Sequence, residues 1–363
     1  MTKRLKIGII GLGSVAELHL EAYQELLGEI EIVALAEVET ARLNRLSNRF
    51  NARAYNDYRQ MIDREKLDIA CVLTPAATHA PITIDCARAG VHVLCEKPLS
   101  TSIEAAQEMT AECDKSRVRL CYGASYRFLP ALQKARELIR TGVIGDVVIL
   151  KEEVVGGGGP ENHKALSFAH YPAGGPGGAG MGLVDHGIHL IDTFTWLIDC
   201  EAESVFGRGD KSGEKPGTEH MHINFRNGAV GQLLYNSGTF STGLPHEGIF
   251  SWGSGWGAGG FVRGGRWAGN PGCIHVHGTK GALRIFYYAN GLFLLTKDGP
   301  EQIALAGRPA PAHFAAQLHA FVTNIVQNRP SDVPGEIGLS ALRVLFAVYE
   351  SFHRRALVTL SRI

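Results

Sequence analysis

The first 123 residues alternate short apolar runs with segments of helical periodicity, and this alternation constrains the fold more than any other feature of the chain. The expected strands are 5–10, 29–37, 67–74, 90–96 and 118–123, and the expected helices are 14–27, 38–50, 79–90 and 101–116. Repeated strand–helix–strand units form right-handed crossovers and a parallel sheet covered on both faces. The sequence therefore predicts an α/β Rossmann-type domain with a parallel sheet over residues 1–123.

A glycine turn joins the first strand to the first helix. Its sequence, GLGSVA at 11–16, matches the G-x-G-x-x-A form of the dinucleotide fingerprint. The first glycine permits a tight turn, the second lets the backbone approach a pyrophosphate, and the alanine allows close helix–strand packing. Glycine strings arise by chance in a chain with 44 glycines, but here strand, turn, helix and second strand follow in order. The expected cofactor contacts in this turn are Gly11, Gly13, Ser14, Val15 and Ala16.

Glu37 lies at the end of the second expected strand, about 20 residues after the glycine turn. An acid at this place bonds the 2′-hydroxyl of the adenosine ribose. Since the next basic side chain is Arg42, the sequence favours NAD over NADP as the cofactor.

Two further strand ends carry polar residues. Thr74, Pro75 and His79 follow one expected strand, and Glu96-Lys97-Pro98 follows the next. In open parallel sheets ligands bind beyond the carboxyl ends of the strands, so these positions predict a binding site. The alternative for the Glu-Lys pair is an ordinary surface ion pair in a loop.

Residues 124–363 show a different pattern. A helix at 129–142 and a strand at 145–155 precede closely spaced strand-like segments with hairpin turns, and two helices at 313–328 and 338–356 close the chain. The strand-like segments are 220–227, 229–238, 273–278, 282–288 and 291–298. With 363 residues, the chain exceeds what one core usually supports. We therefore expect a second, α+β domain with a large, mostly antiparallel sheet over 124–363.

The segment DHGIHLID at 185–192 interrupts an apolar run that extends from 182 to 198. On an α-helix Asp185, His189 and Asp192 fall on one narrow stripe of an otherwise apolar surface. We interpret the stripe as the lining of a cleft, in which Asp185 and His189 have a chemical task. Asp192 and His186 are expected to make structural contacts.

The segments GLGSVA, LTPAATH, CEKPLS, SYRF and DHGIHLID, in this order and spacing, resemble the Gfo/Idh/MocA family over the whole chain. This family includes glucose–fructose oxidoreductase, inositol dehydrogenases and other sugar-modifying dehydrogenases. The resemblance implies an N-terminal Rossmann domain and a C-terminal domain with a largely antiparallel sheet. It also implies a tightly held nicotinamide cofactor and a homodimer or homotetramer built through that sheet.

The resemblance also implies roles for single residues. By this resemblance the cofactor is bound by Gly11, Gly13, Ser14, Val15, Ala16, Glu37, Thr74, Pro75, His79, Glu96, Lys97 and Arg127, and the catalytic residues are Lys97, Asp185 and His189. Glu96 and Lys97 would meet the nicotinamide ribose and the substrate. The sequence has ASYRF where the family often has Asn-Arg-Arg-Phe, which is a departure beside Arg127.

Oxidation of a secondary alcohol needs a base for the hydroxyl proton while hydride leaves the carbon. An imidazole with a reference pKa of about 6.5 suits this task near neutral pH, and a carboxylate one turn earlier can orient it. We therefore expect His189 to be the acid/base, Asp185 to orient it, and Lys97 to donate to the substrate oxygen. The alternative makes Lys97 the base and His189 a hydrogen-bonding residue.

Composition limits the partners. Lys plus Arg and Asp plus Glu both number 36, which excludes a global field for nucleic acid or an anionic membrane. Seven scattered cysteines without paired spacing indicate reduced thiols in the cytoplasm. The chain has no apolar run of about 20 residues, so no membrane span is expected. His220, His222, His275 and His277 lack the spacing of zinc ligands, and we expect no metal.

The expected substrate is a polyol, sugar, cyclitol or nucleotide-sugar, by resemblance to the family. Two other functions stay open: a cofactor-binding sensor without turnover, and a NAD-dependent glycosidase that oxidises its substrate transiently. Glycine-rich tracts at 156–160, 173–182 and 251–260 are either loops over a site or subunit contact, or disordered segments.

Overall fold

The computed structural model describes residues 4–155, 182–209, 218–236 and 273–361. The glycine-rich tracts at 156–160 and 251–260, and the tract at 173–182 except Gly182, lie outside these residues. The described chain divides into two compact units. The first contains the residues up to Ser125 together with Phe314–Leu342, and the second begins at Tyr126. The expected domain boundary between residues 123 and 124 stays a prediction.

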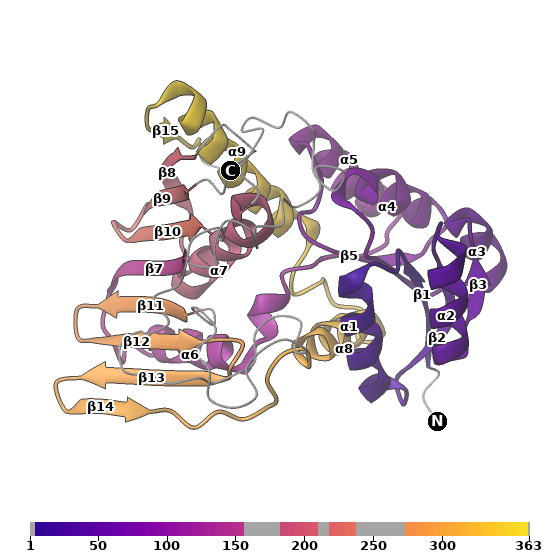
Figure 1. Cartoon of the computed structure of the whole chain (residues 1–363), viewed down its shortest axis with the longest axis horizontal. Coiled ribbons are helices and arrows are strands. Elements are labelled where there is room, and N and C mark those ends of the chain that lie inside the picture. Colours follow the sequence, from indigo (N-terminus) through magenta and orange to yellow (C-terminus); the bar gives the residue numbers. More distant parts are fainter. Residues whose placement is uncertain (1–3, 156–181, 210–217, 237–272, 362–363) are drawn as a thin grey trace. The chain divides into compact units, whose positions relative to one another are not determined.

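The first unit is built on a six-stranded parallel sheet (Figure 1). Its strands lie in the order β3-β2-β1-β4-β5-β6, which is the order of a dinucleotide-binding Rossmann sheet. The strands are β1 (Leu5–Ile10), β2 (Ile30–Ala36), β3 (Arg53–Tyr55), β4 (Ile69–Val72), β5 (His92–Cys95) and β6 (Leu120–Tyr122). The helices of the same part of the chain are α1 (Ser14–Tyr23), α2 (Thr40–Phe50), α3 (Tyr58–Glu65), α4 (His79–Arg88) and α5 (Ile103–Lys115).

Burial explains why these apolar runs form the sheet. All four residues of β4 are buried, which is the pattern of a strand covered on both faces. Local sequence sets a helix boundary, because the Ser102 hydroxyl accepts a hydrogen bond from the Ala105 N–H at 3.1 Å at the start of α5. The sequence did not predict β3 or α3, which are short and rich in charged residues.

The second unit contains a nine-stranded sheet in the order β14-β13-β12-β11-β7-β10-β9-β8-β15. Its pairs are antiparallel except for β7 with β10, which run parallel. The strands are β7 (Val147–Val155), β8 (Ala202–Arg208), β9 (Glu219–Phe225), β10 (Val230–Asn236), β11 (Cys273–Gly278), β12 (Gly281–Phe286), β13 (Gly291–Thr296), β14 (Gly299–Gln302) and β15 (Val358–Thr359). The later helices of the chain are α6 (Pro130–Arg140), α7 (Ile188–Ile198), α8 (His313–Val326) and α9 (Gly335–Arg354).

Helices α6 and α7 pack on one face of this sheet (Figure 1). A side chain at Gly231 of β10 would meet the Phe194 ring of α7 at 2.9 Å, so glycine lets the helix approach the strand closely. Strand β9 alternates buried and half-buried residues, as expected for a sheet with one covered face. The predicted fold class, a parallel Rossmann sheet plus a large and mostly antiparallel sheet, is confirmed. Across the described ranges, no helix combines the length and apolar character needed to cross a bilayer.

Candidate functional site

The glycine turn has the backbone that its sequence predicts. Gly11 has a φ of +87°, and a Cβ there would lie 2.7 Å from Thr74 Cγ2 and 2.9 Å from the backbone of Leu73. Only glycine fits this position without strain. A Cβ built on Gly13, which precedes α1, would meet none of the described atoms within 4 Å. The start of α1 is therefore open, and its N–H groups suit the pyrophosphate of a dinucleotide.

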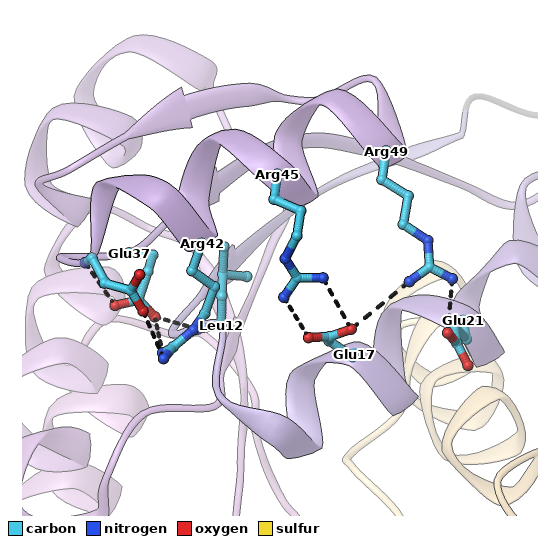
Figure 2. Close-up of polar contacts among 8 residues, drawn as sticks. Leu12, Glu17, Glu21, Glu37, Arg42, Arg45 and Arg49 are labelled. Atoms are coloured by element: carbon cyan, nitrogen blue, oxygen red, sulfur yellow. Dashed lines mark hydrogen bonds and ion pairs between the residues drawn. The ribbon is translucent and has the colours of Figure 1, made fainter. Parts of the chain in front are cut away.

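Glu37 lies at the end of β2 and is tied to the glycine turn (Figure 2). Its Oε2 accepts a hydrogen bond from the Leu12 N–H at 2.8 Å, and its Oε1 accepts one from the Glu39 N–H at 3.0 Å. The Arg42 guanidinium lies 3.7 Å from Glu37 and 2.7 Å from Glu39. A carboxylate fixed at this strand end fits the diol of an adenosine ribose, and its charge opposes a 2′-phosphate.

His79 joins the ends of two strands. Its Nε2 lies 2.7 Å from the Thr74 carbonyl oxygen after β4, and its Nδ1 lies 3.0 Å from the Pro98 carbonyl oxygen after β5. The ring is fully buried, and burial lowers the pKa of His79. His79 thus holds together the two loops in which the sequence places Thr74, Pro75 and Lys97. Its contact with a cofactor stays a prediction.

Glu96 is buried and bonded through both oxygens. Oε1 lies 3.0 Å from His19 Nε2, and Oε2 accepts the Lys97 N–H at 3.0 Å. Burial alone raises the pKa of Glu96, but the hydrogen bond and charge of His19, with the charge of Lys97, hold that pKa below its usual range. Glu96 therefore sets the backbone of the turn that presents Lys97. The contact of Glu96 with the nicotinamide ribose stays a prediction.

His19 is a site residue that the sequence reasoning missed. It lies on the buried face of α1, where its Nδ1 is 2.8 Å from the Tyr23 hydroxyl and its ring stacks on Phe314 at 3.9 Å. The available signal was a histidine within a run of buried apolar positions, which required a polar partner. That partner, Glu96, lies 77 positions along the chain and could not be identified from spacing.

In the second unit, the segment DHGIHLID forms the start of a continuous helical segment. Leu183–Gly187 makes a single π-helical turn, and α7 continues from Ile188. The expected regular α-helix is therefore wrong for the first turn, because the backbone there bonds to the fifth residue instead of the fourth. Asp185 lies in the π turn and His189 in the first turn of α7. Such π turns occur frequently at functional sites.

The other two titratable residues of this segment have named partners. His186 Nε2 lies 2.9 Å from Oε2 of Glu152, a buried residue of β7. Asp192 accepts two hydrogen bonds from the Arg127 guanidinium, at 2.6 and 2.9 Å. Both residues hold the helical segment in place. The expected contact of Arg127 with the nicotinamide stays a prediction.

His189 lies against an aromatic cluster. Its ring stacks on that of Tyr126, with 4.1 Å between centroids and 8° between planes. The Tyr126 hydroxyl is hydrogen-bonded to that of Tyr288, and the Tyr287 hydroxyl donates to Glu152 Oε1 at 2.7 Å. The sequence reasoning missed these tyrosines and Glu152, because they come from segments remote from DHGIHLID.

A buried carboxyl group lies at the start of the same helical segment. Glu219 of β9 accepts a hydrogen bond from the Leu183 N–H at 3.1 Å. Burial raises the pKa of Glu219 to about 7, although hydrogen bonds from Leu183 and Gly182 act in the opposite direction. In the part of the chain that the structure describes, three or more His, Cys, Asp or Glu residues nowhere gather as metal ligands would.

The strand order, the glycine turn and the acid at the end of β2 define a dinucleotide-binding protein of the Rossmann class. A family model described as an oxidoreductase family with an NAD-binding Rossmann fold matches residues 5–124. The model of the same family's C-terminal alpha/beta domain matches residues 136–360. The chain belongs to the Gfo/Idh/MocA oxidoreductase family. The predicted family and the predicted cofactor class are confirmed.

Relatives named as dehydrogenases resemble this chain along much or all of its length. Myo-inositol 2-dehydrogenase of Thermotoga maritima is 24% identical over 371 residues, covering 99% of both chains. D-glucoside 3-dehydrogenase of Escherichia coli is 27% identical over 249 residues, covering 68% of this chain and 69% of the relative. The crystal structure of aldose-aldose oxidoreductase from Caulobacter crescentus matches with a TM-score of 0.80 and 23% identity, covering 99% of this chain and 100% of that one. The chain is therefore an oxidoreductase within a group of dehydrogenases.

Proposed function

We propose that this protein is a NAD-dependent dehydrogenase that transfers hydride between nicotinamide and a secondary alcohol or ketone of a sugar, cyclitol or nucleotide-sugar. One observation carries the proposal: Asp185 and His189 occupy adjoining turns at the start of the helical segment, with His189 buried and stacked. The similarity to dehydrogenases of inositol and of glucosides supports a substrate with ring hydroxyl groups.

His189 is the proposed acid/base. In the oxidation direction an imidazole nitrogen takes the proton of the substrate hydroxyl, and in reduction it returns that proton. The Asp185 carboxylate orients the ring. The Lys97 ammonium donates a hydrogen bond to the substrate oxygen and lowers the pKa of the hydroxyl, because a nearby positive charge favours the alkoxide. Bound NAD supplies the acceptor of the hydride.

The proposed cofactor contacts are those of the glycine turn and of three strand ends. They are Gly11, Gly13, Ser14, Val15, Ala16, Glu37, Thr74, Pro75, His79, Glu96, Lys97 and Arg127. The open N-terminus of α1 and the fixed carboxylate of Glu37 support the first part of this set.

Substitution of the two candidate bases tests the assignment. We expect His189→Ala to lower kcat by roughly 10²–10⁴-fold, the usual contribution of a general base. It should also remove the acidic limb of the pH–rate profile and leave NAD affinity, measured by fluorescence titration, unchanged. Lys97→Ala should lower kcat while the limb persists. Full turnover by His189→Ala would exclude His189 as the base and favour Lys97.

A substrate panel tests the reaction class. The protein is incubated with NAD or NADP and a series of polyols, cyclitols and sugars, while the absorbance of the reduced nicotinamide is followed. We expect turnover with NAD on at least one alcohol. Tight cofactor binding with no turnover on any alcohol or ketone would instead favour the alternative function, a cofactor-binding sensor without turnover. Release of a glycone without net reduction of NAD would favour the glycosidase.

Two further proposals concern the oligomeric state of the protein and the cellular compartment in which it works. Ile149, Leu234 and Leu295 project apolar side chains to solvent from the nine-stranded sheet, which supports a homodimer or homotetramer through it. Six of the seven cysteines are buried, which supports a reducing compartment such as the cytoplasm.

A further inference from the structure

A tyrosine ring lies directly against the proposed base. The Tyr126 and His189 rings are nearly parallel, with 8° between their planes and 4.1 Å between centroids. Tyr126 is 1% exposed and His189 is 8% exposed, so the stacked pair is shielded from water. Tyr126 follows the last strand of the first sheet in sequence and is the second residue of SYRF.

The Tyr126 ring is itself fixed. Its hydroxyl is hydrogen-bonded to that of Tyr288, whose ring meets it edge-on at 5.5 Å. The Tyr287 ring packs on it at 5.0 Å. Tyr287 in turn donates to Glu152, which also bonds His186 in the same helical segment as His189. Because Tyr287 and Tyr288 hold the Tyr126 ring in place, that ring keeps the stacked imidazole of His189 from rotating.

The stack also has an electrostatic consequence. The face of an aromatic ring is negative, and a cation within about 6 Å of the ring centroid is attracted to it. Because the centroid distance is 4.1 Å and water is excluded, the Tyr126 ring favours the protonated imidazole of His189 over the neutral one. The protonated form is the one His189 reaches when it takes the proton of the substrate hydroxyl.

The stacked residues, their sequence neighbours and the elements that contact the same helical segment carry other charged and titratable groups. They are Asp185, His186 and Asp192 in the same helical segment, Arg127 beside Tyr126, Glu152 of β7, Glu219 of β9, and Tyr287 and Tyr288 after β12. Glu219 is the group to separate by experiment, since burial raises its pKa to about 7, where an imidazole also titrates. The tyrosines stay neutral near pH 7, because burial raises the pKa of Tyr287 and Tyr288 well above the usual value.

We propose that Tyr126 is a positioning residue for His189, which fixes the plane of the imidazole and stabilises its protonated form during hydride transfer. This inference rests on the proposed function, in which His189 is the acid/base. It adds a residue whose hydroxyl bonds away from His189, so its role is carried by the ring.

The test uses rings of equal shape and different charge distribution. Tyr126→Phe keeps the ring and serves as the reference, and a ring-fluorinated phenylalanine at 126 keeps the shape but weakens the negative face. We expect the acidic limb of kcat/KM for alcohol oxidation to stay in place for Tyr126→Phe. With the fluorinated ring it should move to lower pH by about 0.5–1 unit, since a cation–π contact is worth roughly 0.5–2 kcal/mol.

Tyr126→Leu removes the ring altogether. We expect kcat to fall about tenfold with unchanged affinity for NAD, because the imidazole plane is no longer held. Tyr288→Phe is the matched control: it removes a hydroxyl from the same cluster, keeps the Tyr126 ring, and should leave the acidic limb in place. Repeating the series in a Glu219→Gln background excludes Glu219 as the titrating group.

The outcomes separate this inference from the proposed function. If His189→Ala is inactive but the limb stays at the same pH with every ring, Tyr126 is only a packing residue and the inference is overturned. If His189→Ala keeps full turnover, the proposed function fails and the inference fails with it. If His189→Ala is inactive and the acidic limb of kcat/KM moves to lower pH with the fluorinated ring, the result supports both the proposed function and the role of Tyr126.

Discussion

Each unit contains a histidine–glutamate pair with a buried carboxyl group, beside a residue proposed for catalysis. In the first unit His19 Nε2 lies 3.0 Å from Glu96, which immediately precedes Lys97. In the second unit His186 Nε2 lies 2.9 Å from Glu152, and His186 immediately follows Asp185. The two pairs have the same chemistry and nearly the same length. They differ in what the second carboxylate oxygen does.

The second oxygen of Glu96 accepts the backbone N–H of Lys97, its own neighbour. That of Glu152 accepts the hydroxyl of Tyr287, which lies 135 positions along the chain. Glu96 therefore fixes the conformation of one turn, whereas Glu152 joins β7, the helical segment and the residues after β12. The same histidine–glutamate contact thus serves local backbone geometry in one unit and tertiary structure in the other.

Removal of the Glu152 carboxylate should have the largest effect on stability. Glu152→Ala leaves His186 and the buried Tyr287 hydroxyl without their acceptor, so we expect the free energy of unfolding to fall by about 3–5 kcal/mol. Glu152→Gln keeps one acceptor oxygen and should cost less. Urea denaturation followed by circular dichroism measures both. A smaller loss for Glu152→Ala than for Glu96→Ala would contradict the contrast between the two pairs.

Glu219 extends the comparison to a buried carboxyl group held by backbone N–H groups. Because its folded pKa is raised to about 7, the folded state binds more protons than the unfolded state above about pH 4.3, and stability falls as the pH rises towards 7. Glu219→Gln should abolish this loss, which amounts to about 3 kcal/mol. Unfolding free energies of the two proteins at pH 5 and pH 8 check it. Equal pH dependence would show that Glu219 is ionised in the folded protein at both pH values.

The contribution of the Glu96–His19 contact to folding stability should change with pH in the opposite direction. Its lowered pKa means that its stabilising contribution is complete above about pH 4.3 and is lost as the pH falls through the folded pKa. We expect Glu96→Gln to cost about 2 kcal/mol at pH 7, the size of a hydrogen bond to a charged group. The difference from the parent protein should shrink on acidification. An acid-independent difference would mean that the carboxyl group is neutral.

Among the contacts compared here, the exposed ion pairs between α2 and α1 are expected to contribute least to stability (Figure 2). Arg45 lies 2.7 Å from Glu17, and Arg49 lies 2.8 Å from Glu21, with both arginines about half exposed. Water and salt screen such pairs. Arg45→Ala should therefore leave the midpoint of thermal unfolding unchanged within error. A clearly lower unfolding midpoint for Arg45→Ala would show that an exposed ion pair stabilises this protein.

The sequence predicted those parts of the molecule that depend on neighbours along the chain. The turn at Gly11 and Gly13 follows from backbone sterics, and the acid at Glu37 follows from its place at the end of an apolar run. The short strand β3, with three residues at the sheet edge, carries no apolar alternation and was missed. The π turn at Leu183–Gly187 was also missed, because side-chain periodicity does not report which carbonyl each N–H meets.

The supporting residues of the site could not be predicted for a different reason. Tyr126 and Glu152 contact His189 and His186 only because the second unit folds, and each is an ordinary residue in its own segment. Spacing identifies partners within a helix or a hairpin. It does not identify partners across a nine-stranded sheet.

The single parallel pair in that sheet has a consequence for how the enzyme can change. β7 and β10 pair from Ile149 with Val230 to Val155 with Asn236, so the chain between them, including Asp185 and His189, forms one long loop closed at its base. The entropy of closing a loop grows only with the logarithm of its length, and each doubling costs about 0.6 kcal/mol. Insertions in the turn between the end of α7 at Ile198 and the start of β8 at Ala202 would therefore cost little in stability. The chain can therefore lengthen at that turn while the paired strands β7 and β10 keep their register.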